Sequence, residues 1–197
     1  MKICIILLTL FSLSAQAQVL GELKGQGQIQ ASYATFSGSK DVRTSPCNVA
    51  MNIHQKPGSF ELEFSVFECP KLDNWNDPYY AYNIVNGQLI DSTGAVKGAV
   101  AADGSIQFTE KSMSLTKYYL DTYDATCRLL YSTSKTLALN TVINYSFKQN
   151  TDGSWQVHRQ TSEDRLAYTT HRDYPTCPAQ TIPTKLGSTT DLSVVVK

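Results

Sequence analysis

The cysteines are the residues whose chemistry the sequence constrains most. Four of them lie outside the first 17 residues, and they are Cys47, Cys69, Cys127 and Cys177. Near the start of the chain, Lys2 is followed by an apolar run and by the small-residue motif AQA, which ends at Ala17. This order of segments is typical of an export signal that is cleaved after Ala17. An even number of cysteines in an exported chain predicts disulfides and disfavours a catalytic thiol. We therefore expect two disulfides.

Strand register favours one of the three possible disulfide pairings. The stretch CNVAMNIHQKPGSFELEFSVFECP holds two alternating strands around a Pro-Gly turn. Matching their apolar faces leaves Cys47 opposite Glu68. A bulge at Val66-Phe67 would shift the second strand by one residue and bring Cys69 opposite Cys47, within disulfide reach. This register predicts Cys47–Cys69, which leaves Cys127–Cys177 as the second bond.

The histidines do not form a catalytic or metal-binding pattern. His54 and His158 fall on the polar faces of predicted strands, and His171 lies in TTHRDY. The chain has no H-E-x-x-H, no G-x-S-x-G and no Gly-rich phosphate loop. The segment DNWND (73–77) is rich in oxygen ligands, but these do not alternate as in a calcium loop. We therefore predict no catalytic residue, no metal site, no cofactor and no enzymatic activity.

Aromatic residues are the best candidates for ligand contacts. They concentrate in WNDPYYAY (75–82) and KYYLDTYDATCRLLY (117–131). Tyrosine and tryptophan combine apolar area with a polar tip, which suits cavities and interfaces, although aromatic residues also simply favour strands. Adjacent tyrosines on a strand point to opposite faces, so at most one of each pair can line a cavity. The predicted ligand-binding residues are Trp75, Tyr80, Tyr82, Tyr119 and Tyr123.

The elements that would position these residues are β-strands, because alternation with period two dominates the chain. Asn86-Gly87 predicts a tight hairpin with Ile84 opposite Leu89, and Asp-Gly-Ser turns at 103–105 and 152–154 predict hairpins whose glycine is left-handed. The predicted registers of these two hairpins place Gly98 opposite Phe108, Phe147 opposite Val157 and Tyr145 opposite Arg159. Residues 112–140 could be two strands, one long bent strand, or include a short helix. The proline-rich segment 172–190 is expected to be a loop, followed by a closing strand in 191–197.

The predicted fold is all-β: an antiparallel up-and-down meander of about eight to ten strands that closes into a barrel, stapled by two disulfides. Residues 18–197 would form this single domain after removal of the signal peptide 1–17. At fold level the pattern resembles the calycin barrels of lipocalins and avidins. The lipocalin G-x-W is missing from GELKGQGQ (21–28), so no ligand follows from the resemblance. A two-sheet β-sandwich is the alternative fold.

Charge and location restrict the classes of partner. The chain has 17 basic and 17 acidic residues and no basic stripe, which argues against a nucleic-acid partner. Position 18 is glutamine, so no lipid anchor is expected there. The strands carry too many polar residues for a membrane-embedded barrel. We expect an exported protein, periplasmic or secreted.

Three functions fit these features, and the oligomeric state stays open. In the first, the interior of the barrel binds a small apolar or aromatic ligand. The second is an envelope protein-interaction or inhibitor module, which would present the loop YPTCPAQTIP (174–183) held by Cys177. The third is a structural protein without a small-molecule site.

Overall fold

The computed structural model describes residues 18–19 and 22–197, and its strands form one antiparallel sheet. The predicted signal peptide 1–17 lies outside the described residues, so its cleavage stays a prediction. The strands are β1 (Gln18–Val19), β2 (Leu23–Ala34), β3 (Lys40–Lys56), β4 (Ser59–Phe67), β5 (Trp75–Asn76), β6 (Tyr80–Val85), β7 (Gln88–Ile90), β8 (Val96–Val100), β9 (Ile106–Tyr123), β10 (Leu129–Gln149), β11 (Trp155–His171) and β12 (Gln180–Val196). None of the described residues is helical, so no helix there could cross a membrane.

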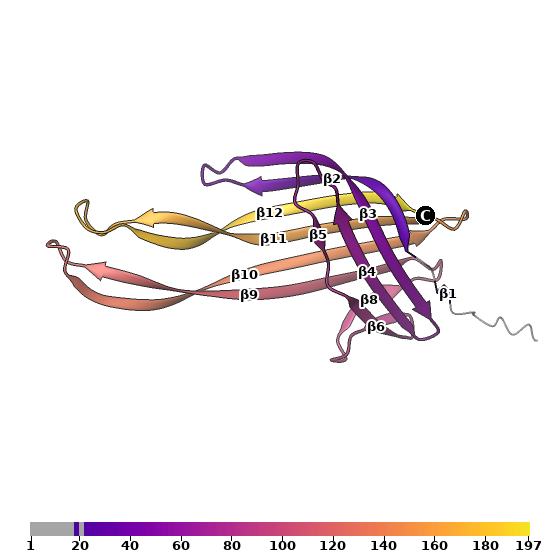
Figure 1. Ribbon diagram of the computed structural model, residues 1–197. Helices are drawn as coiled ribbons and strands as arrows, with labels where there is room; N and C mark the ends of the chain where they lie inside the picture. The colour runs from indigo at the N-terminus through magenta and orange to yellow at the C-terminus, as the bar shows by residue number, and fades with distance from the viewer. Residues whose placement is uncertain (1–17, 20–21) are drawn as a thin grey trace, which may run out of the picture.

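The strands close a ring of hydrogen bonds (Figure 1). The sheet order is β1-β3-β2-β12-β11-β10-β9-β8-β7-β6-β4-β5, and β3 also pairs with β4. Most neighbours in the ring are also neighbours in sequence, whereas β2 and β12 come from opposite ends of the chain. The predicted all-β antiparallel fold with two disulfides is therefore confirmed.

The hydrophobic core fills the interior of the ring. Alternate residues of the ring strands face inward, so β4 buries Phe60, Leu62, Phe64 and Val66 while the residues between them are more exposed. Aromatic rings dominate the centre of this core. The closest pair of ring centroids, Phe108 and Tyr145, is 4.9 Å apart. Each such side chain contributes about 1.5–3 kcal/mol on burial, so the interior is the main source of stability.

The predicted hairpin registers are confirmed. Ile84 faces Leu89 across the Asn86-Gly87 turn, and Phe147 faces Val157 across the Asp152-Gly153 turn. Gly104 and Gly153 have φ angles of 79° and 83°, as the Asp-Gly-Ser turns require. The Gly-rich start of β2 has a different role, because a Cβ on Gly25 would lie 2.3 Å from the carbonyl oxygen of Val195. Gly25 thus permits β2 to pass close to β12.

The bulge predicted at Val66-Phe67 is wrong. Regular pairing continues through Val66 to Asn48↔Phe67, and the phase change comes one residue later. Glu68 has a left-handed backbone with a φ of 53°, and its carboxylate accepts a hydrogen bond from Nδ2 of Asn48. One residue with positive φ redirects the chain as effectively as a bulge. The predicted Cys47–Cys69 disulfide therefore forms, with the Cα atoms 4.6 Å apart.

The prediction of a loop over 172–190 is correct for 172–179 and wrong for 180–190. β12 begins at Gln180, and Pro183 lies within it, opposite Tyr168 of β11. At this point β12 pairs only with β11, because its pairing with β2 begins at Ser188. A proline is tolerated in a strand whose N–H side has no neighbour. Residues 112–123 belong to β9 and 129–140 to β10, with a turn at 124–128 between them.

Candidate functional site

Two long ribbons project from the ring and form the first candidate site. β10 and β11 pair with each other only from Gln149↔Trp155 to Thr141↔Glu163. Beyond that point β9–β10 and β11–β12 continue as separate two-stranded ribbons, which extend to one side of the ring in Figure 1. We call residues 112–140 and 164–187 the arm. The arm is built by the same four strands that complete the ring.

The two ribbons meet again at their ends. Asp121 of β9 donates its backbone N–H to Oε1 of Gln180 on β12 (2.8 Å), and Nε2 of Gln180 donates to the carbonyl oxygen of Asp121 (2.6 Å). At the base of the arm β10 lies next to β11, whereas at its end β9 lies next to β12. Two-stranded ribbons have a strong right-handed twist, visible in Figure 1, and this twist turns β9 towards β12.

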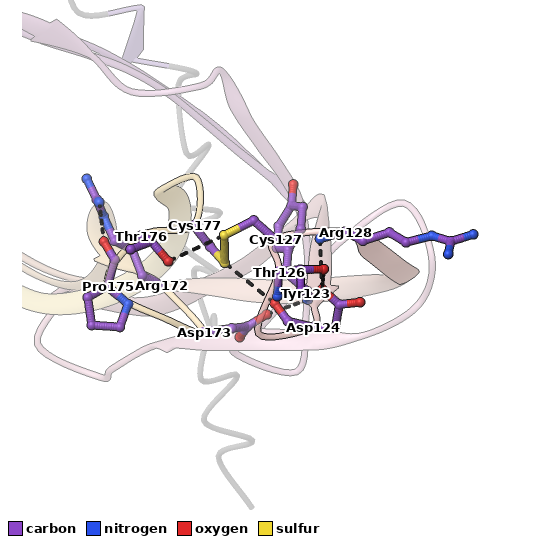
Figure 2. The surroundings of a disulfide bond; sticks show 10 residues. All are labelled: Tyr123, Asp124, Thr126, Cys127, Arg128, Arg172, Asp173, Pro175, Thr176 and Cys177. Carbon is purple, nitrogen blue, oxygen red and sulfur yellow. Dashed lines mark hydrogen bonds between the residues drawn. A yellow bond between two sulfur atoms is a disulfide. The ribbon is translucent and has the colours of Figure 1, made fainter.

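A disulfide closes the end of the arm. Cys127 in the β9–β10 turn is bonded to Cys177 in the β11–β12 turn, as predicted, with the Cα atoms 5.0 Å apart (Figure 2). Oδ2 of Asp173 accepts the backbone N–H of Tyr123 at 2.7 Å, and Oδ1 of Asp124 accepts three hydrogen bonds within its own turn. These contacts hold the two turns in one fixed arrangement.

The arm exposes large apolar side chains. Tyr119 is 72% exposed and Leu130 is 57% exposed. Of the large hydrophobic residues that are exposed, the arm carries Met113, Leu115, Tyr119, Leu129, Leu130, Tyr131, Leu166, Tyr168 and Tyr174. The residues next to the disulfide-bonded turns are Leu129, Leu130, Tyr131 and Tyr174, and we call them the tip surface. Exposed apolar side chains that gather in one region are candidates for an interaction surface, whereas single scattered ones are not.

The second candidate site is a polar layer where the core ends, beneath the base of the arm. Arg159 of β11 donates to both carboxylate oxygens of Asp77, from Nε at 2.7 Å and from Nη2 at 2.6 Å. It also donates from Nη1 to Oγ1 of Thr161, and the hydroxyl of Tyr145 donates to Asp77. The side chains of Arg159 and Asp77 are each only 5% exposed.

The pKa values reflect this burial. Burial alone would lower the pKa of Arg159, but the hydrogen bonds to Asp77 and the adjacent Tyr145 raise it on balance. Desolvation, followed by the charge of Asp77, raises the pKa of Tyr145 well above its ordinary value. Arg159 is thus a permanent cation and Tyr145 stays protonated.

A cavity of about 340 Å³ lies beside this polar layer. Its lining includes Tyr33, Trp75, Asp77, Arg159, Glu163 and Arg165. A second cavity of about 300 Å³ shares Thr141 and Ile143 with the first. It contains Glu110, which accepts hydrogen bonds from the Tyr82 hydroxyl at 2.6 Å and from Lys97 at 2.9 Å. We call the first of these spaces the mouth cavity.

The residues predicted to bind a ligand do not form one site. Tyr80 and Tyr82 are mostly buried in the aromatic core, with ring centroids 6.4 Å apart, and both also line the second cavity. Trp75 is half-buried and lines the mouth cavity. Tyr119 and Tyr123 lie on the arm, Tyr119 exposed and Tyr123 half-buried. The structure thus places three of the five at the ring and two away from it.

Sequence reasoning missed the ion pair of Asp77 and Arg159. Arg159 was placed opposite Tyr145 by the predicted register, which is confirmed, and Tyr145 faces the interior. An arginine paired with a core tyrosine is a signal for a buried ion pair that could have been used. The acidic partner carries no such signal, because Asp77 lies 82 residues away in an irregular segment.

Comparisons with known proteins add no identity to these sites. Among the described residues, no group of three or more His, Cys, Asp or Glu side chains could hold a metal ion. No protein-family model matches the chain, and a search of curated proteins finds no significant match. The function therefore has to be argued from the ring and the arm.

Proposed function

We propose that this chain is an exported protein-interaction module that binds a partner protein through the tip surface of the arm. The observation that carries the proposal is the set of exposed apolar side chains beside the Cys127–Cys177 disulfide. Disulfides indicate an oxidising, extracytoplasmic environment, so the partner would be an envelope or extracellular protein. The proposed domain is a calycin-like barrel, supported by the ring of hydrogen bonds, and it would serve as the scaffold of the arm.

The chemistry of the tip surface suits a protein partner. Tyrosine is enriched among residues that dominate binding energy, and Tyr131 and Tyr174 are 58% and 40% exposed. Association costs less free energy when the binding element is already ordered. The disulfide and the hydrogen bonds of Gln180 and Asp173 supply that order. The segment 174–183, which the sequence predicted to contact a partner, begins at this end of the arm.

The interior of the ring gives less support to the first predicted function. Phe60, Phe147 and Leu89 occupy the space in which an apolar ligand would bind, and each is fully buried. The mouth cavity is lined by charged side chains, and the second cavity, although it reaches Tyr80 and Tyr82 of the core, is lined by Asp91, Lys97 and Glu110 as well. An interior ligand would have to displace well-packed side chains.

Photo-cross-linking in the source cells tests the proposal. A photoreactive amino acid replaces Leu130 on the tip surface or, as the control, Val195, which is 48% exposed on the ring. We expect a defined cross-linked protein from position 130 that is lost when Tyr131→Asp is added, and no such product from position 195. Equal products from both positions, or none from position 130, would overturn the proposal. Products with lipid alone would assign the tip surface to a membrane instead.

A further inference from the structure

Two residues that line the mouth cavity, Trp75 and Arg159, have N–H donors without a partner in the described part of the chain. Nε1 of Trp75 is buried, yet it has no hydrogen-bond partner in the described part of the chain. A guanidinium group has five N–H bonds, and the contacts of Arg159 with Asp77, Tyr145 and Thr161 use one on each nitrogen. One N–H on each of Nη1 and Nη2 is left without an acceptor among the described residues. Buried donors of this kind call for acceptor atoms.

The charges that line the mouth cavity disfavour an ionic ligand. Three carboxylates and two guanidinium groups line it: Asp73, Asp77, Glu163, Arg159 and Arg165. Asp77 neutralises Arg159 through two hydrogen bonds, so an incoming anion would gain little from Arg159 and would approach carboxylates. A cation would meet the two arginines in the same way. A neutral ligand avoids both conflicts.

The remaining groups suit hydroxyl groups. Glu163 already accepts one hydrogen bond, from Oγ of Ser188 at 3.0 Å, and a carboxylate can accept several more. Donors and acceptors thus line the same small space, and a hydroxyl group can serve both at once. The rings of Tyr33 and Trp75 also line this space, but the guanidinium of Arg165 lies 4.6 Å from the Tyr33 centroid and that of Arg159 lies 5.3 Å from the Trp75 centroid. Hydrogen bonds, more than packing on these rings, would therefore hold a ligand. The volume of about 340 Å³ is at the small end of the range for ligand pockets.

We infer that the mouth cavity binds a neutral, polyhydroxylated ligand, namely a mono- or disaccharide. The sugar hydroxyls accept from Trp75 and Arg159 and donate to Glu163. This inference is independent of the function proposed for the arm, because no residue that lines the mouth cavity belongs to the tip surface.

Calorimetry on the purified full chain tests the inference with glucose, N-acetylglucosamine and lactose, and with acetate and inorganic phosphate as ionic probes. We expect at least one sugar to bind with a Kd below about 10 mM and the two anions to bind more weakly. Trp75→Phe keeps an aromatic ring but removes the N–H donor, so it should weaken sugar binding about tenfold. Loss of one hydrogen bond in a desolvated site has an effect of this size.

Trp155→Phe is the matched control. Nε1 of Trp155 is likewise buried without a partner in the described residues, but Trp155 does not line the mouth cavity. It should leave sugar affinity unchanged, as should Leu130→Asp on the tip surface. The inference is overturned if no sugar of the panel binds, if an anion binds more tightly than every sugar, or if Trp75→Phe and Trp155→Phe have the same effect.

Discussion

The strands β9 to β12 run through both the ring and the arm, yet most of their apolar side chains are buried in the ring, whereas many are exposed in the arm. In the ring β10 has β9 on one side and β11 on the other, and it buries Tyr145 and Phe147. In the arm β10 has only β9 as a hydrogen-bonded neighbour, and Leu130 and Tyr131 are exposed. Apolar composition alone therefore does not decide burial. A strand buries one face only where a closed ring provides an interior.

The arm is ordered by other means than a core. An isolated two-stranded ribbon is marginally stable in water. Here each ribbon is anchored in the ring at its base and by the Cys127–Cys177 disulfide at its end. Side chains also cover free strand edges, since Oδ2 of Asp164 accepts the backbone N–H of Asn140 at 3.2 Å. The ring is thus held by burial, and the arm by covalent and polar contacts at its two ends.

The largest expected difference between ring and arm is in the loss of stability when a charged residue is removed. Asp77→Ala leaves Arg159 buried without its carboxylate, so the free energy of unfolding should fall by about 3–5 kcal/mol. Lys185→Met removes only the 3.0 Å contact with Asp164 in the arm, where both side chains are partly exposed, and should cost about 1 kcal/mol or less. Urea unfolding followed by far-UV circular dichroism measures both. Equal losses would contradict the distinction between ring and arm.

A smaller difference in the loss of stability is expected when a leucine is shortened in the ring and in the arm. Leu62 is fully buried in β4, so Leu62→Ala should lower the free energy of unfolding by about 3 kcal/mol through lost burial and a cavity. Leu115 on the arm is 60% exposed, and Leu115→Ala should change the free energy of unfolding by about 0.5 kcal/mol or less. Urea titrations of the two variants provide the measurement. A large loss for Leu115→Ala would show that the arm has a packed core of its own.

The smallest expected effect is on acid titration of the turns. Hydrogen bonds from Ser154, and then the contact with Lys197, lower the pKa of Asp152 in the ring to about 2. A hydrogen bond from Thr126 lowers the pKa of Asp124 at the end of the arm. Because folding lowers both pKa values, the carboxylates stabilise the turns above pH of about 4, and for Asp152 this stabilisation is lost as the pH falls towards about 2.

Carboxyl carbon NMR during a pH titration measures these midpoints. Ser154→Ala should raise the pKa of Asp152 more than Lys197→Met does, and Thr126→Ala should raise that of Asp124. Protonation of Asp124 should disturb only the signals of the tip, since the disulfide still holds the turn. A midpoint near 4 for Asp152 in the unmodified protein would refute the assigned cause.

Local structure was largely predictable from the sequence. The Asn86-Gly87 and Asp-Gly-Ser turns predicted their registers because a left-handed residue at a defined position sets the pairing of the strands next to it. The pairing of the cysteines was also predicted, although Glu68 and not a bulge provides the phase change. The segment 180–190 was mispredicted because the effect of Pro183 depends on whether its strand has a neighbour on that side.

By itself, then, the sequence determined the hairpins, the β class and the two disulfides, because each depends on residues close in the chain or on the cysteine count. Only the tertiary structure decided that β2 pairs with β12, that Asp77 reaches Arg159, and that four strands extend beyond the ring as an arm. These features join residues far apart in the chain. The strands β9 to β12 run without a break from the ring into the arm, and what changes is the number of neighbouring strands.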